Sequence, residues 1–257
     1  MKIDFFSGSR TKISVQDYYI IILLLVNNLY LRLIYLLLLI MFEYILPIIG
    51  MVLTPLVDFS LYSVSSFLVK PQKFSMSTQK RALQDWHGNI INYLLTWYLI
   101  YYRFTWEIPN LFDGLLSLLY FFIVDTTFYF LHRACHVFLY YQIHQKHHLC
   151  QPIGSHCARH SHWIDATLEN LSFFTPFFIF YYNAYCAFLC LILNSIWASY
   201  IHTYPIRIEK AGFMNSPYLH WIHHQYGSES SCNYSLYFTI FDRLFGTLNE
   251  KSKIQIN

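Results

Sequence analysis

Charged residues are scarce in this chain of 257 residues. Asp, Glu, Lys and Arg together make up 12% of the sequence, whereas hydrophobic residues make up 56%. Because soluble domains usually carry about 25% charged residues, this scarcity argues against a soluble protein and favours one embedded in a membrane. The formal net charge is only +3, and no basic stripe interleaved with aromatic residues is present. We therefore expect no nucleic-acid partner.

Motifs that would indicate other classes are also missing. No dinucleotide-binding fingerprint stands between a strand and a helix, so electrons for a redox reaction would come from an external donor. The H-E-x-x-H motif of zinc proteases is absent. The six cysteines have no spacing typical of a disulfide framework, and we expect them to be reduced.

Long apolar runs predict an all-α membrane protein. A helix needs about 20 largely apolar residues to cross the hydrocarbon core, and four stretches come close to this length: 18–42, 44–69, 89–106 and 111–131. A fifth stretch, 171–201, is interrupted by Pro176, Asn183 and Asn194. It is either one long tilted span or a hairpin that enters and leaves the membrane on the same face.

The basic residues favour one topology. If the first four stretches cross the membrane, 15 of the 17 Lys and Arg residues share a side with the histidine-rich segments, the exceptions being Arg32 and Arg103. Cytoplasmic loops are enriched in these residues, so we expect the histidine side to be cytosolic. For His220 to lie on the same side as His132, the stretch 171–201 must be a re-entrant hairpin.

Histidines form clusters with the spacing of metal ligands. The pattern H-x-x-H-H would occur by chance about 0.03 times in a chain of this length with this histidine content, yet it occurs twice. The first copy is His144, His147 and His148, and the second is His220, His223 and His224.

A third cluster and two single histidines extend this set. His132 and His136 have the i, i+4 spacing that places two imidazoles on one helix face. Imidazole binds iron, zinc and copper well, and eight clustered imidazoles exceed the needs of one tetrahedral zinc ion. The count therefore predicts two metals. His162 and His202 are further candidate ligands, although a single histidine is more often a hydrogen-bonded structural residue.

An acidic residue shares a helix face with the third cluster. Asp125, Tyr129, His132 and His136 fall at i, i+4, i+7 and i+11. A carboxylate within an apolar run is costly, and we interpret Asp125 as the acceptor of an imidazole N–H. The alternative is a carboxylate solvated by a water-filled pocket. Further candidate acceptors are Asp165, Glu169 and Asp242.

These motifs together resemble the fatty acid hydroxylase and sterol desaturase superfamily of integral membrane di-iron enzymes. The resemblance covers residues 122–247 and includes D-x-x-x-Y-x-x-H-R-x-x-H at 125–136, both H-x-x-H-H motifs, and F-D-R-L-F-G-T at 241–247. Family members usually also have a histidine in a segment like His-Pro-x-Glu, where this chain has H-W-I-D from His162. They have another near the end of the hairpin, where His202 stands.

The resemblance implies a single domain over 1–257, with about four transmembrane helices, a re-entrant helical hairpin and a cytosolic helical cap that holds two metals. It implies two iron ions, with zinc possible after purification, and O2 as co-substrate. It also implies a lipid substrate from the bilayer, cytochrome b5 or a similar electron donor, and a location in the endoplasmic reticulum, or in the inner membrane of a bacterium. Asp125 and Asp242 are the acidic residues assigned to the catalytic site. The implied metal ligands are His132, His136, His144, His147, His148, His162, His202, His220, His223 and His224.

Several functions stay open at this point. Hydroxylation and desaturation begin with the same hydrogen abstraction, so the ligands do not distinguish them. A zinc-dependent membrane hydrolase would need fewer imidazoles, and a metal transporter should have its histidines inside the spans. A catalytically inactive homologue that binds lipid in a structural or regulatory role is the remaining alternative, against which the intact motifs argue.

Overall fold

The computed structural model describes residues 31–34, 36–37, 103–105, 107–151, 153–205, 207–229 and 232–251. The chain divides into two compact units, Met1–Ile48 and Ile49–Asn257. In the first unit the described residues are helical, with exposed apolar side chains. The predicted span 44–69 lies outside the described residues, and 18–42 and 89–106 are described only at the few positions given. The single-domain organisation stays a prediction.

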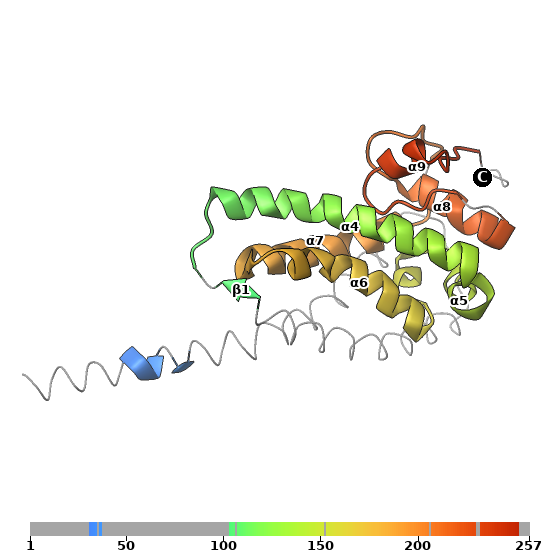
Figure 1. Cartoon of the computed structure of the whole chain (residues 1–257). Helices are drawn as coiled ribbons and strands as arrows, with labels where there is room; N and C mark the ends of the chain where they lie inside the picture. The colour runs from blue at the N-terminus through green and yellow to red at the C-terminus, as the bar shows by residue number, and fades with distance from the viewer. Residues whose placement is uncertain are drawn as a thin grey trace, which may run out of the picture. The chain divides into compact units, whose positions relative to one another are not determined.

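Three helices lie side by side in the second unit (Figure 1). They are α4 (Leu111–Phe138), α6 (Trp163–Ile179) and α7 (Ala184–Ile201), and α4 packs against both of the others. By length and composition, α4 and α7 could each cross a membrane. This mostly helical architecture agrees with the predicted all-α class. The number of spans and the membrane orientation stay predictions.

Helix α4 begins with a capping box. The Asn110 side chain accepts the N–H groups of Phe112 and Asp113 at 2.8 and 3.2 Å, and the Asp113 carboxylate accepts the Asn110 N–H at 2.8 Å. These bonds satisfy donors that have no partner inside the first turn. The helix continues to Phe138, beyond the predicted end at residue 131. Its last two turns therefore carry the H-R-A-C-H motif.

The stretch 171–201 belongs to a helical hairpin rather than to one long helix, whereas its entry into a membrane stays a prediction. Helix α6 ends at Ile179, the chain reverses through 180–183, and α7 runs back. Asn183 caps α7 by accepting the N–H groups of Tyr185 and Cys186. The other two predicted interruptions leave the helices intact. Pro176 has no N–H for the Ser172 carbonyl, which accepts the Thr127 hydroxyl at 3.4 Å instead, and Asn194 lies inside α7.

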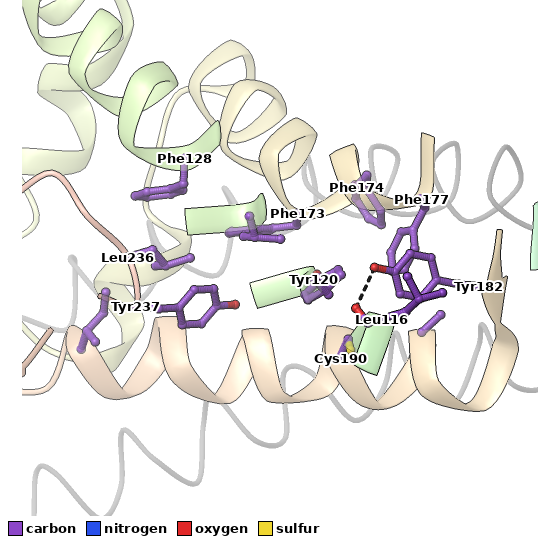
Figure 2. Close-up of a cluster of buried hydrophobic side chains, with 13 residues drawn as sticks. Leu116, Tyr120, Phe128, Phe173, Phe174, Phe177, Tyr182, Cys190, Leu236 and Tyr237 are labelled. Carbon is purple, nitrogen blue, oxygen red and sulfur yellow. Dashed lines mark hydrogen bonds between the residues drawn. The ribbon is translucent and has the colours of Figure 1, made fainter. Parts of the chain in front are cut away.

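A short parallel strand pair lies at the hairpin turn. Strand β1 (Phe104–Thr105) pairs with β2 (Tyr182–Asn183). The end of the predicted third span is therefore extended rather than helical. The Tyr182 hydroxyl also donates to the Leu116 carbonyl at 2.9 Å, which ties the turn to the first half of α4 (Figure 2).

An aromatic core joins the three helices. The rings of Phe128 and Phe173 stack with centroids 6.1 Å apart, and those of Tyr120 and Phe177 lie 5.3 Å apart. Figure 2 shows that these side chains form one cluster, to which Leu236 and residue 237 contribute from a loop. Close packing of this kind resists displacement, so it fixes the end of α4 that bears the histidines.

Shorter elements gather at that end of α4 (Figure 1). The chain leaves α4 through a π-helix, η2 (Tyr140–His144), and continues into α5 (Gln145–His148) and a 3-10 helix, η3 (Ser155–Arg159). After α7 it forms α8 (Pro217–Tyr226), η4 (Gly227–Glu229) and α9 (Ile240–Leu244).

Two of the cysteines differ from expectation. Cys150 and Cys157 form a disulfide with their Cα atoms 5.6 Å apart, so the prediction that all cysteines are reduced is wrong for this pair. The loop between α5 and η3 brings them within the ordinary range for a disulfide, which their separation in sequence did not indicate. Cys135 and Cys190 are buried and form no disulfide.

Candidate metal centre

Nine of the ten predicted ligand histidines lie in two adjacent groups, all of them buried. Within each group, the candidate ligand atoms lie within 4.8 Å of one another. The five-histidine group consists of His132, His136, His144, His148 and His223. The four-histidine group consists of His147, His202, His220 and His224.

Helical geometry explains why H-x-x-H-H occurs twice. Neighbouring residues of an α-helix point about 100° apart, whereas residues i and i+4 share a face. The first motif thus gives His144 and His148 to the five-histidine group and His147 to the other. The second motif is reciprocal, because His220 and His224 belong to the four-histidine group and only His223 crosses to the five-histidine group.

A π-helical turn joins the H-R-A-C-H motif to the H-Q-K-H-H motif. The His144 N–H donates to the Leu139 carbonyl at 3.4 Å, and the Gln145 N–H donates to the Tyr140 carbonyl, five residues back in each case. Such turns are often found at functional sites. Here the turn lets the chain pass from H-R-A-C-H to H-Q-K-H-H while both motifs contribute to one group.

Backbone carbonyls fix the tautomer of four imidazoles. The Nδ1 atoms of His132 and His223 lie 3.0 and 2.8 Å from the carbonyl oxygens of Tyr234 and Cys232. A carbonyl only accepts, so each Nδ1 carries the proton and each Nε2 presents a lone pair. The same holds in the four-histidine group for His147, at 3.2 Å from the His160 carbonyl, and for His202, at 2.7 Å from the Ala198 carbonyl.

The Nε2 atoms converge in a way that fits a cation. Those of His147 and His202 are 3.3 Å apart, and both carry lone pairs because both Nδ1 atoms are protonated. Two facing lone pairs repel, and a metal ion between them removes that repulsion. In the other group the buried Nε2 of His223 has no hydrogen-bond partner among the described residues. The donor set therefore fits metal binding in both groups.

Burial keeps these imidazoles in the form that binds metals. Desolvation lowers the pKa of both His147 and His223 from 6.5 to about 3. The neighbouring imidazoles lower the pKa further. At pH 7 the rings are neutral, as metal ligation requires.

The carboxyl group of Asp165 contacts the centre directly. The Asp165 Oδ1 lies 2.9 Å from the Nδ1 of His144, and both side chains are fully buried. Burial, and then the nearby Glu169, raise the pKa of Asp165 to about 9. Sequence reasoning named Asp165 only as a further candidate. The signal in the sequence was the position of Asp165 three residues after His162, in the H-W-I-D segment that stands where family members have His-Pro-x-Glu.

His162 lies outside both groups. It is the N-cap residue of α6, and its Nδ1 accepts the Ile164 N–H at 3.3 Å. The side chain is only half-buried and its ring lies against Trp163. The structure thus gives His162 a helix-capping contact in place of the predicted metal contact.

The two acidic residues assigned to the catalytic site bind backbone amides. Asp125 accepts N–H groups of residues 236–238, and Asp242 accepts those of Tyr234 and Ser235. No contact described for either carboxylate reaches an imidazole. The interpretation of Asp125 as the direct acceptor of an imidazole N–H is therefore wrong, because its oxygens are already occupied by the loop that crosses α4.

A cavity adjoins both groups. It touches His132 of the five-histidine group and His147, His202 and His220 of the four-histidine group. The rest of the cavity lining is mostly apolar, with one cationic and one acidic side chain. It comprises Phe128, Ala158, Arg159, Glu169, Phe173, Ala198, Ile201 and Leu236. An apolar group in this cavity would lie against imidazoles of both groups.

Fold and centre define a helical protein with two adjacent groups of buried histidines that could hold metal ions. Residues 117–247 match the family model described as fatty acid hydroxylase, and the chain belongs to this family. The match contains every residue of both histidine groups.

Curated relatives include enzymes of sterol oxidation. Human lathosterol oxidase is 31% identical over 157 residues, which are 58% of this chain and 50% of that protein. Methylsterol monooxygenase 1-3 of Arabidopsis thaliana is 29% identical over 147 residues, 54% of this chain and 50% of that protein. Delta(7)-sterol 5(6)-desaturase of Eremothecium gossypii is 31% identical over 136 residues, 51% of this chain and 37% of that protein.

The chain spans half or less of the length of these three relatives. No solved structure matches the chain. The relatives are oxidoreductases of lipids by name, and together with the two apolar helices of this chain they support a membrane protein.

Proposed function

We propose that this protein is a membrane-bound di-iron oxidoreductase that uses O2 to hydroxylate or desaturate a lipid of the sterol or fatty-acyl type. The convergence of nine buried imidazoles into two adjacent groups carries this proposal. The names of the relatives support the reaction class.

Ligand number and reaction class both favour iron. Imidazole also binds zinc tightly, and zinc is expected in protein purified without added iron. However, structural zinc is almost always four-coordinate, whereas one group offers five imidazoles. Zinc also undergoes no redox change, and the relatives are oxidoreductases by name.

The chain supplies ligands, their orientation and an adjoining cavity whose lining includes apolar side chains. Bound iron would supply the oxygen chemistry that attacks an unactivated C–H bond. Backbone carbonyls hold His132 and His202 with their Nε2 atoms toward the centre. The walls formed by Phe128, Phe173 and Leu236 would hold an apolar segment of the substrate beside these rings by dispersion contacts.

The setting of the reaction is also part of the proposal. Electrons would come from cytochrome b5 or a similar donor, because the sequence has no dinucleotide fingerprint. The distribution of Lys and Arg supports a cytosolic centre, in the endoplasmic reticulum or in the inner membrane of a bacterium.

Labelled oxygen tests the proposal in membranes that express the chain with an electron donor. The variant replaces His147, His148, His223 and His224 by Ala, and untargeted lipid mass spectrometry compares it with the wild type. A lipid that gains a labelled hydroxyl, or loses two hydrogens, only with the intact chain supports the proposal. A His162→Asn variant is the matched control, because Asn preserves the helix cap and leaves both groups intact.

The inactive lipid-binding homologue predicts another result. In that case the wild type would bind two irons and receive electrons, but the lipids would be unchanged. That outcome would reject the oxidase function.

A further inference from the structure

Five consecutive backbone amides are held by two buried carboxylates. Asp242 accepts the N–H groups of residues 234 and 235 at 2.9 and 3.0 Å. Asp125 accepts those of residues 236, 237 and 238 at 2.9, 2.6 and 3.3 Å. The two side chains are 2% and 0% exposed, so these bonds are shielded from water. Charge-assisted bonds of this kind are among the stronger hydrogen bonds in proteins.

The same segment orients two metal ligands. The Cys232 carbonyl accepts the Nδ1 proton of His223, and the Tyr234 carbonyl accepts that of His132. Both imidazoles belong to the five-histidine group. In the four-histidine group, the described carbonyl acceptors come from residues 160 and 198, in other parts of the chain.

Rigid peptide units connect the carboxylate to the ligands. The Tyr234 carbonyl and the Ser235 N–H belong to one planar peptide, so Asp242 holds one end of the unit whose other end orients His132. A second path leads from Asp242 to His223, because the Cys232 carbonyl that orients His223 shares a planar peptide with the Asn233 N–H. The Asn233 N–H donates to the Thr247 carbonyl at 3.0 Å, and the Thr247 hydroxyl donates to Asp242 at 2.7 Å.

We propose that Asp242 is a positioning residue for the metal in the five-histidine group. It acts through the peptide units that orient His132 and His223. Among the described hydrogen bonds, none joins these peptide units to an imidazole of the four-histidine group; the nearest one runs from the Asn233 side chain to the Leu219 carbonyl in the backbone of α8. This inference rests on the proposed function, since it presumes that both groups bind metal. Asp125 accepts the N–H groups of residues 236–238 and so holds the next part of the same segment.

Site selectivity separates positioning from a general structural role. Loss of the fold would weaken binding at both groups, whereas loss of positioning affects one. The test uses the full-length chain purified in detergent and titrated anaerobically with Fe²⁺, with chelator competition for affinity and elemental analysis for stoichiometry. In Asp242→Asn we expect one iron to bind roughly 10-fold more weakly or worse, while the affinity for the other is unchanged.

Double mutants assign the weakened site. In a His223→Ala background, Asp242→Asn should cause little further loss, because both changes act on the same group. In a His220→Ala background, the two losses should add. Asp113→Asn is the matched control, since Asp113 caps the far end of α4 and should leave both affinities unchanged.

Two results would overturn the inference. In the first, the wild type binds two irons, and Asp242→Asn lowers the iron affinity of both sites equally or of neither. That result rejects the role of Asp242 but is compatible with the proposed function. The other is a wild type that binds no iron, which overturns the proposed function as well. If Asp242→Asn does not accumulate, Thr247→Val removes one donor to Asp242 with little change in shape. A smaller loss confined to the five-histidine group supports the inference, and unchanged binding at that group overturns it.

Discussion

The rings of His148 and His224 stack with centroids 4.6 Å apart, although the two residues belong to different ligand groups. They come from α5 and α8, more than 70 residues apart in sequence. This contact makes the two groups one continuous cluster of buried imidazoles.

The division of each H-x-x-H-H motif between the groups has a direct consequence. His147→Ala should weaken the iron in the four-histidine group, and His148→Ala should weaken the iron in the five-histidine group. We expect a loss of roughly 10-fold or more in affinity for one iron in each case, since removing a ligand should cost at least as much as removing an outer contact. Fe²⁺ titration of each variant, alone and combined with His220→Ala, checks the assignment. If His147→Ala and His148→Ala weaken the same iron, the division is wrong.

Asp165 is predicted to orient His144. Asp165→Leu keeps roughly the size of the side chain but removes the oxygen that bonds the His144 Nδ1. Loss of such outer contacts typically lowers metal affinity about 10- to 100-fold. We expect that loss for the iron in the five-histidine group, measured by chelator competition. Asp113→Leu is the matched control, and an Asp165→Leu variant with wild-type affinity would show that the contact does not matter.

Acid should destabilise the metal-free protein. The pKa values of His147 and His223 are about 3 in the folded state, against about 6.5 in an unfolded chain. Between these values the unfolded state binds more protons, so stability falls as the pH decreases from 6.5 toward 3. Each of the two residues contributes a slope of up to about 1.4 kcal/mol per pH unit. Thermal unfolding of the iron-free chain at pH 7.5, 6.5 and 5.5 measures this, and a midpoint that stays constant or rises in acid contradicts it.

His162 should affect stability without affecting metal content. Its side chain caps α6, and loss of a cap usually costs about 1 kcal/mol. His162→Ala should therefore lower the unfolding midpoint and leave iron stoichiometry at the wild-type value, while His162→Asn should keep both. Elemental analysis decides between helix capping and metal ligation. Loss of one iron in both variants would show that His162 is a ligand.

The sequence was sufficient to predict which histidines gather. The repeated H-x-x-H-H motif and the i, i+4 pair in α4 depend only on helical periodicity, which is local. The buried face that carries Asp125, Tyr129, His132 and His136 follows from the same periodicity. We predicted the hairpin from the requirement that all three histidine clusters lie on one side of the membrane.

Contacts between distant segments were not predictable. The carbonyls that orient His132 and His223 belong to the backbone, and every residue has a carbonyl, so no side-chain pattern reveals them. Asp125 was placed correctly on the histidine face, but its partners lie more than 100 residues away. The helix-capping contact of His162 was not predictable either, because a histidine that caps a helix has no distinguishing sequence signal.

Single-turnover oxidation of lipid tests the central claim most directly. The purified two-iron protein, with lipid extract from its host membranes, is reduced chemically without oxygen and then mixed with labelled O2, so that no protein donor is needed. We predict about one oxidised lipid per two-iron chain, carrying the label if the product is hydroxylated, and none from the variant lacking His147, His148, His223 and His224. Reoxidation of both irons with no change in any lipid would contradict the account.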